Sequence, residues 1–135
     1  MLRCVTRAAT LLVLAACSLA FCLPASAQAV RKFPANALRG EIVITNPPEL
    51  VLNQKIAARL APGSRIRGMD GMQVMSGALI GRKLVVHYTL DPTSGHLLDV
   101  WVLTAQEFAR KPWPSTPAEA ATWQFNPDAQ VWFKP

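Results

Sequence analysis

Short apolar runs separated by turn-forming residues make up the middle of the chain. Most of these runs are rich in β-branched residues, are too short for helices, and end at Gly, Pro, Asn or Asp, which predicts strands. The predicted strands cover residues 41–45, 49–52, 55–60, 64–67, 72–75, 82–90 and 96–103.

Two connections between these runs follow from turn chemistry. Asn53 and Gln54 stand between two short apolar runs, so we expect a hairpin over residues 49–60. Pro62 and Gly63 predict a turn that separates residues 55–60 from residues 64–67.

The clearest element is a hairpin over residues 82–103, whose connector 91–95 is rich in turn residues. If Leu90 faces His96, alternation of side chains places His87 directly opposite Asp99 on a mixed face, which also carries Lys83 and Trp101. The other face is apolar and predicts a core made of Leu84, Val86, Tyr88, Leu90, Leu98, Val100 and Val102.

Two short helices are expected after the last strand, near residues 105–111 and 117–123. Thr104 with Glu107, and Thr116 with Glu119, match the capping-box spacing at a helix start. The aromatic tail from Trp123 onwards is expected to close a sheet edge. We therefore predict a mainly β fold, a small antiparallel β-sandwich or partly open barrel, with one or two short C-terminal helices.

The first 27 residues have the pattern of a cleaved secretory signal peptide. Arg3 and Arg7 precede an uncharged apolar run at 8–23, and Pro24 is followed by small residues. Cleavage after Ala27, or after Ala29 in a second register, leaves an N-terminal arm up to residue 39, which Phe33 anchors, and one β-rich domain over 40–135. The predicted location is the periplasm.

The cysteines allow an alternative to this processing. Leu14, Ala15, Ala16 and Cys17 match a lipobox, which would make the chain a lipid-anchored envelope lipoprotein, an accessory tethered through Cys17. Because all three cysteines precede residue 28, cleavage after Ala27 leaves no disulfide, thiol nucleophile or Cys-ligated metal.

His87 and Asp99 are the candidate catalytic pair. A carboxylate that orients an imidazole is part of a nucleophilic triad, so a small hydrolase is one alternative, although no Gly-x-Ser-x-Gly motif is present. A cross-strand pair that only stabilises the hairpin is the simpler interpretation. The two histidines match no metal-site spacing, so we predict no metal and no cofactor.

Basic residues provide the more suggestive binding pattern. Arg65 and Arg67 alternate around Ile66, so both point to one side of a strand, where guanidinium groups can hold phosphate or carboxylate oxygens. A net charge of +6, reduced to +4 by loss of Arg3 and Arg7, also fits an ordinary solvated surface. The tentative binding residues are Arg59, Arg65, Arg67, Arg82, Lys83 and Trp101.

All four tryptophans lie in the last 35 residues. Such residues more often fill a core than a binding surface, because each buries a large area. Trp101, on the mixed face of the hairpin, is the best candidate for a surface role.

Six stretches of the chain resemble a family of short exported proteins of Gram-negative bacteria. The resemblance covers residue 31 to about residue 107 and implies a periplasmic setting, while it supplies no activity and no catalytic residue. The matching stretches are residues 31–34, 39–40, 52–55, 59–67, 75–79 and 100–104.

Together these patterns predict a non-catalytic periplasmic domain that binds a protein partner or an anionic cell-envelope polymer or lipid. The predicted export makes nucleic acid an unexpected ligand, and we expect no transmembrane span after cleavage, because the apolar run lies within the signal peptide.

Overall fold

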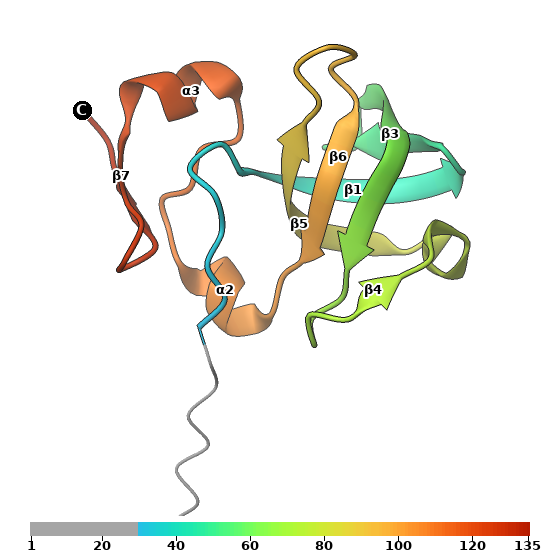
Figure 1. The fold of residues 1–135 in the computed structure, drawn as a ribbon, viewed down its shortest axis with the longest axis horizontal. Coiled ribbons are helices and arrows are strands. Elements are labelled where there is room, and N and C mark those ends of the chain that lie inside the picture. Colours follow the sequence, from blue (N-terminus) through green and yellow to red (C-terminus); the bar gives the residue numbers. More distant parts are fainter. Residues whose placement is uncertain (1–29) are drawn as a thin grey trace, which may run out of the picture. The chain divides into compact units, whose positions relative to one another are not determined.

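Residues 30–135 are described by the computed structural model, and Lys32–Pro135 form one compact unit. Both predicted cleavage sites and Cys17 lie before residue 30, so the predictions on processing lie outside the described residues. Figure 1 shows the arrangement of the strands and helices, coloured along the sequence. The strands are β1 (Leu38–Asn46), β2 (Glu49–Leu52), β3 (Ile56–Arg67), β4 (Gln73–Val74), β5 (Lys83–Leu90), β6 (Leu97–Val102), β7 (Gln124–Asn126) and β8 (Val131–Phe133).

Five of these strands close into a barrel. The sheet order is β2-β1-β5-β6-β3-β4, and a further pairing of β2 with β3 closes the ring and leaves β4 as an extra strand. All neighbours in the ring are antiparallel except β3 and β6, which run parallel. The predicted mainly β fold is confirmed; the barrel is closed and mixed. Numbered in chain order, its strands follow 1-2-3-5-4-1, the connectivity of OB-type barrels.

The first three strands are joined by short connections. Asn46 to Pro48 end β1, and the predicted hairpin of β2 with β3 is confirmed. Asn53 and Gln54 both have positive φ, as a tight hairpin turn requires. Asn53 also bonds back to β1, because its side-chain Oδ1 accepts a hydrogen bond from the backbone N–H of Glu41 at 3.0 Å.

Strand β3 corrects one predicted turn. Pro62 and Gly63 lie inside a single strand of 12 residues rather than between two strands. Gly63 has φ +77°, and the pairing of β3 with β6 shifts between Leu60 and Arg65. Pro62 and Gly63 therefore form an irregularity at which β3 bends around the barrel. A residue in the left-handed region changes the direction of the strand without ending its pairing with β6.

The β5–β6 hairpin has a different register from the predicted one. His87 pairs with Trp101 and Tyr88 with Val100, whereas Leu90 pairs with Leu97 after a shift. The prediction that His87 faces Asp99 is therefore wrong. The irregularity also interrupts the alternation in β6, so that Leu97 is buried in the core where Leu98 was expected.

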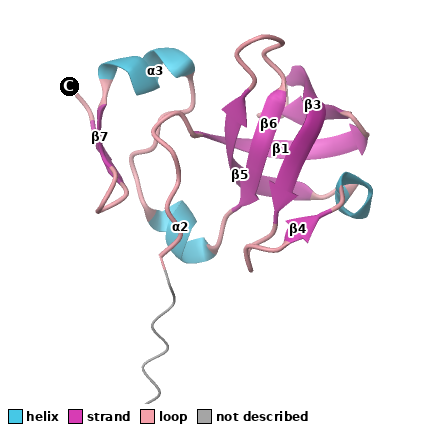
Figure 2. Ribbon diagram, in the orientation of Figure 1, coloured by secondary structure: helices cyan, strands magenta, loops and turns pink. Residues whose placement is uncertain are grey.

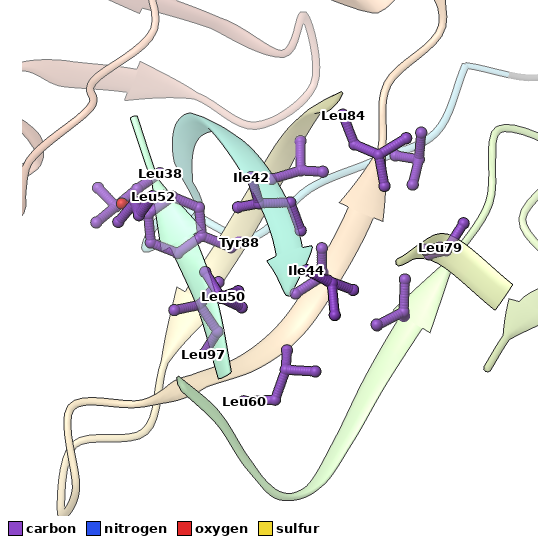
Figure 3. Close-up of a cluster of buried hydrophobic side chains, with 14 residues drawn as sticks. Leu38, Ile42, Ile44, Leu50, Leu52, Leu60, Leu79, Leu84, Tyr88 and Leu97 are labelled. Atoms are coloured by element: carbon purple, nitrogen blue, oxygen red, sulfur yellow. The ribbon is translucent and has the colours of Figure 1, made fainter. Parts of the chain in front are cut away.

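One hydrophobic core fills the barrel (Figure 3). Strands β1 and β5 each contribute alternate residues, as predicted for half-buried strands. The buried members are Leu38, Ile42, Ile44, Leu50, Leu52, Leu60, Ile66, Leu79, Leu84, Val86, Tyr88, Leu97, Val100 and Val102. Leu79 comes from the short 3-10 helix η2 (Ser76–Leu79) between β4 and β5.

Both predicted helices are present, as α2 (Ala105–Ala109) and α3 (Pro117–Thr122) (Figure 2). Thr104 and Glu107 form the complete capping box, and the Thr116 side chain accepts a hydrogen bond from the backbone N–H of Glu119. The tail does not close an edge of the barrel sheet. It forms its own two-stranded sheet, β7 with β8.

A second cluster, here called the aromatic cluster, joins this C-terminal part to the barrel. Its buried members are Phe33, Ala37, Leu103, Trp113 and Trp132, and Trp101 packs against it. The arm residue Phe33 is 4% exposed, which confirms that it anchors the arm.

The two ends of the described chain are also held by direct bonds. The buried Gln130 side chain accepts a hydrogen bond from the Phe33 N–H at 2.8 Å and donates one to the Phe33 carbonyl at 3.3 Å. Phe33 and Trp113 contact His87, and Phe33 also contacts Trp101, so the part of the hairpin's mixed face around these two residues is covered.

Candidate functional site

Arg65 and Arg67 lie next to each other on the outer surface of β3. They flank Ile66, which is buried in the core, so alternation turns both guanidinium groups outward, as the sequence predicted. The parallel ladder with β6 places Asp99 beside Arg65 and Trp101 beside Arg67. We call these four residues the β3–β6 patch.

Asp99 is shared by the two arginines. Its Oδ1 lies 3.3 Å from Nε of Arg65 and 3.7 Å from Nη1 of Arg67. Among the described residues, this oxygen accepts no hydrogen bond of good geometry. The contacts are therefore loose ion pairs, which are weak at a surface, and one carboxylate offsets only one of two positive charges.

Trp101 forms the edge of the patch. The guanidinium carbon of Arg67 lies 5.9 Å from the centroid of its ring, within the range of a cation–π contact. Phe33 contacts the same indole edge to face, with centroids 5.8 Å apart. The half-buried Trp101 is thus fixed by the aromatic cluster while it still borders the arginines.

Arg59 occupies another part of the same strand. It lines a hollow of about 260 Å³ together with Pro48, Pro62 and His96. These residues come from β3, the β1–β2 connection and the β5–β6 connection, so the hollow lies where two loops meet β3.

Arg82 and Lys83 do not belong to the β3–β6 patch. Both are exposed at the start of β5, and Lys83 Nζ lies 3.9 Å from Glu41 Oε1 on β1. The structure thus brings together Arg65, Arg67 and Trp101 of the predicted binding set, places Arg59 further along the strand, and leaves Arg82 and Lys83 on another strand pair.

His87 is part of the packing between barrel and C-terminal segment. It is 1% exposed, stacks on Trp113 with centroids 4.1 Å apart, and meets Phe33 edge to face at 4.5 Å. Asp99, its expected orienting carboxylate, pairs with the two arginines instead. The predicted cross-strand pair is therefore not formed, and the imidazole is enclosed rather than open to a substrate.

Arg39 is an important residue that the sequence analysis did not single out. Its Nε donates to His87 Nε2 at 3.2 Å, and its remaining nitrogens donate to the carbonyls of Glu107, Phe108 and Arg110 at 2.8–3.2 Å. These carbonyls belong to the C-terminal end of α2; that of Glu107 also accepts the Arg110 N–H at 3.2 Å, whereas those of Phe108 and Arg110 lie where acceptors lack partners within the helix. Burial lowers the pKa of Arg39 to about 10, and Glu107 opposes this shift, so the group stays charged at neutral pH.

Residues 30–135 hold neither a metal cluster nor a membrane-spanning helix. No group of three or more His, Cys, Asp or Glu side chains in this range is placed to hold a metal ion. No helix in the described part of the chain has the length and apolarity needed to cross a membrane.

Comparisons with known proteins give the chain no relative from which a role could be transferred. No protein-family model, no curated protein and no solved structure matches it.

Proposed function

We propose that this protein is an exported, non-catalytic binding module that holds an anionic component of the cell envelope on the outer face of β3. The single observation that carries the proposal is the pair Arg65 and Arg67, which share one carboxylate beside Trp101. Guanidinium groups form paired bonds to phosphate and carboxylate oxygens, and an adjacent indole adds an apolar contact. A protein partner with an acidic surface is the alternative occupant.

The connectivity of the barrel supports β3 as a ligand strand, and the half of β3 that pairs with β2 is the half that carries Arg59. In OB-type barrels the second and third strands, with the loops that follow the first and fourth strands, form the usual ligand surface. The corresponding elements here are β2, β3, the β1–β2 connection and the β5–β6 connection, where Arg59 and His96 border a hollow. Fold alone does not define function, and the charged side chains along β3 are what would hold the anion.

Export is the second part of the proposal, and it rests on sequence. The segment 1–27 matches a signal peptide, and the resemblance to short exported Gram-negative proteins implies the periplasm. Intact mass of the protein from periplasmic and membrane fractions tests this. A soluble species that starts at Gln28 or Val30 supports a free module, whereas a lipid-bearing species that starts at Cys17 supports the tethered alternative.

The absence of catalysis is proposed from the surroundings of His87. A general base must reach the proton that it abstracts, and His87 is enclosed by Phe33 and Trp113. Hydrolysis of simple esters that disappears in His87→Phe, at unchanged folding, would support the small hydrolase instead.

Binding is tested with two anionic probes and their neutral counterparts. We expect the processed protein to bind phosphatidylglycerol vesicles or polygalacturonate, and to ignore phosphatidylcholine vesicles and dextran. The double variant Arg65→Glu/Arg67→Glu should weaken binding by about tenfold or more, since charged hydrogen bonds are worth roughly 1.5–3 kcal/mol each.

The matched control is Arg82→Glu/Lys83→Glu, which makes the same change of charge on another strand pair. Equal loss in both double variants would indicate nonspecific attraction to net charge and would contradict the proposed site. Failure of both anionic probes, with an acidic protein recovered through Arg65 and Arg67, would favour the protein partner.

A further inference from the structure

A second basic and aromatic region lies among the residues that surround the C-terminal helix. A hollow of about 520 Å³ is lined by three cationic side chains, Arg39, Lys111 and Lys134, and by Trp113 and Trp123. Glu119 is the one acidic residue among those that line it. None of these residues belongs to the β3–β6 patch.

The cations at this hollow are held by aromatic rings. Lys134 Nζ lies 5.1 Å from the centroid of Trp123, and Lys111 Nζ lies 4.6 Å from that of Phe108. The guanidinium carbon of Arg39 lies 5.5 Å from the centroid of Trp113. Cation–π contacts of this kind orient a charge without neutralising it. The ordering of these side chains before binding lowers the entropy cost of holding a ligand.

The Glu119 carboxylate forms hydrogen bonds at the start of α3. Its Oε2 accepts hydrogen bonds from the backbone N–H of Ser115 at 2.8 Å and from the Ser115 hydroxyl at 3.2 Å. These bonds spread its negative charge into the helix start, and the bond from the Ser115 N–H is the main cause of its lowered pKa. Three cations and one such carboxylate leave the hollow positive.

From this geometry we infer that the hollow binds a monosaccharide-sized ring that carries one anionic group, either phosphate or carboxylate. The two lysines would face the anionic group, and the half-buried indole of Trp123 supplies the apolar surface against which a sugar ring packs, while the buried Trp113 forms the floor of the hollow. The volume far exceeds that of a bare ion, so inorganic phosphate alone would fill only part of it. A phosphosugar and a uronic acid share this chemistry and differ in the anion.

Binding in this hollow is independent of the proposed function, because the residues that line it are not those of the β3–β6 patch and different tryptophans report on the two sites. The indole N–H resonances of Trp113 and Trp123 would report on this hollow, whereas that of Trp101 would report on the β3–β6 patch. The variant Arg65→Glu/Arg67→Glu is therefore expected to leave binding in the hollow unchanged.

The test follows the four indole resonances of the processed protein during titration with glucose 6-phosphate, glucuronate, inorganic phosphate and glucose. We expect saturable shifts of Trp113 and Trp123 with one or both anionic sugars, weaker shifts with phosphate, and none with glucose. Glucose 6-phosphate alone would define a phosphate site, and glucuronate alone a carboxylate site.

The double variant Lys111→Ala/Lys134→Ala tests the two lysines. Both are exposed, so the fold should persist, and unchanged chemical shifts of the remaining tryptophans would verify this. We expect the dissociation constant to rise about tenfold, which corresponds to roughly 1.4 kcal/mol, while Lys55→Ala in the β2–β3 turn has no effect. No saturable shift with either anionic sugar, equal shifts with glucose, or binding that survives loss of both lysines would overturn the inference.

Discussion

Arg39 donates a hydrogen bond from Nε to Nε2 of His87 at 3.2 Å, and this bond joins β1 to β5 beneath the C-terminal segment. In this geometry Nε2 is the acceptor, so the ring proton of a neutral His87 lies on Nδ1. The same guanidinium holds three carbonyls at the end of α2. Arg39 therefore positions the C-terminal segment on the barrel.

Replacement of Arg39 is expected to loosen this connection. Arg39→Met removes the side-chain donor from the α2 carbonyls, and we expect a loss of about 2 kcal/mol in the free energy of unfolding, measured by urea denaturation. Arg39→Lys keeps the charge but not the fork of donors, so it should recover only part of the loss. Full stability in the Lys variant would show that charge alone matters.

Asp99→Asn is expected to strengthen binding while it changes the stability of the fold little. The substitution removes the negative charge that Arg65 and Arg67 share, so affinity for polygalacturonate or anionic vesicles should rise several-fold, and most strongly at low salt. The free energy of unfolding should fall by at most about 1 kcal/mol, as is usual for surface ion pairs. An affinity that falls instead would show that Asp99 positions the arginines for the ligand.

Asp91 makes the hairpin connection sensitive to acid. The hydrogen bond from the Ser94 hydroxyl, at 2.7 Å, is the main cause of its lowered pKa, and the backbone of Thr93 adds to it. A carboxyl with a lowered folded-state pKa stabilises the protein above its unfolded pKa, and this contribution is lost as pH falls through the folded value. Asp91→Asn should therefore lower the urea midpoint at pH 7. The difference between the midpoints at pH 7 and pH 3 should be smaller in this variant than in the unchanged protein. Asp70→Asn, in another exposed turn, is the control.

Gly40 is a packing constraint on β1. A Cβ at this position would lie 3.0 Å from Leu52 Cδ1 and 3.0 Å from Tyr88 Cε1, both of which belong to the barrel core. We expect Gly40→Ala to cost about 2 kcal/mol through overpacking, measured as a lower midpoint in urea. Gly77→Ala, where no atom lies within 4 Å of the added carbon, should change little.

Local patterns predicted most elements of this fold. A β-branched run that ends at turn residues predicted β1, and alternation predicted the core face of β5. Asn53 and Gln54 predicted the β2–β3 hairpin, and the two Thr-Glu spacings predicted α2 and α3. The bend in β3 was missed because Pro and Gly more often end a strand than bend it. The register of β5 and β6 was missed because an irregular pairing between Tyr88 and Leu90 shifts it.

The sequence predicted the two arginines of the β3–β6 patch but not their neighbours, which come from distant parts of the chain. Spacing alone places Arg65 and Arg67 on one side of a strand, but it does not reveal the parallel neighbour that brings Asp99 to them. Arg39 gave no signal, since its partners on α2 lie 68 to 71 residues further along the chain. Contacts of that range follow from the docking of the C-terminal segment on the barrel, and no short motif encodes them.

The bonds between Phe33 and Gln130 have a consequence for the order of folding. These residues are 97 positions apart, and Gln130 lies five residues before the end of the chain. A chain that emerges N-terminus first, from a ribosome or a translocation channel, presents the arm long before its partner exists. The five barrel strands are complete by Val102, so they can assemble first, whereas the hydrogen bonds that hold Phe33 form only after residue 130 has emerged. The packing of the arm over His87 is therefore completed late in folding. Removal of Gln130 by truncation would release the bonds that hold Phe33 in the N-terminal arm.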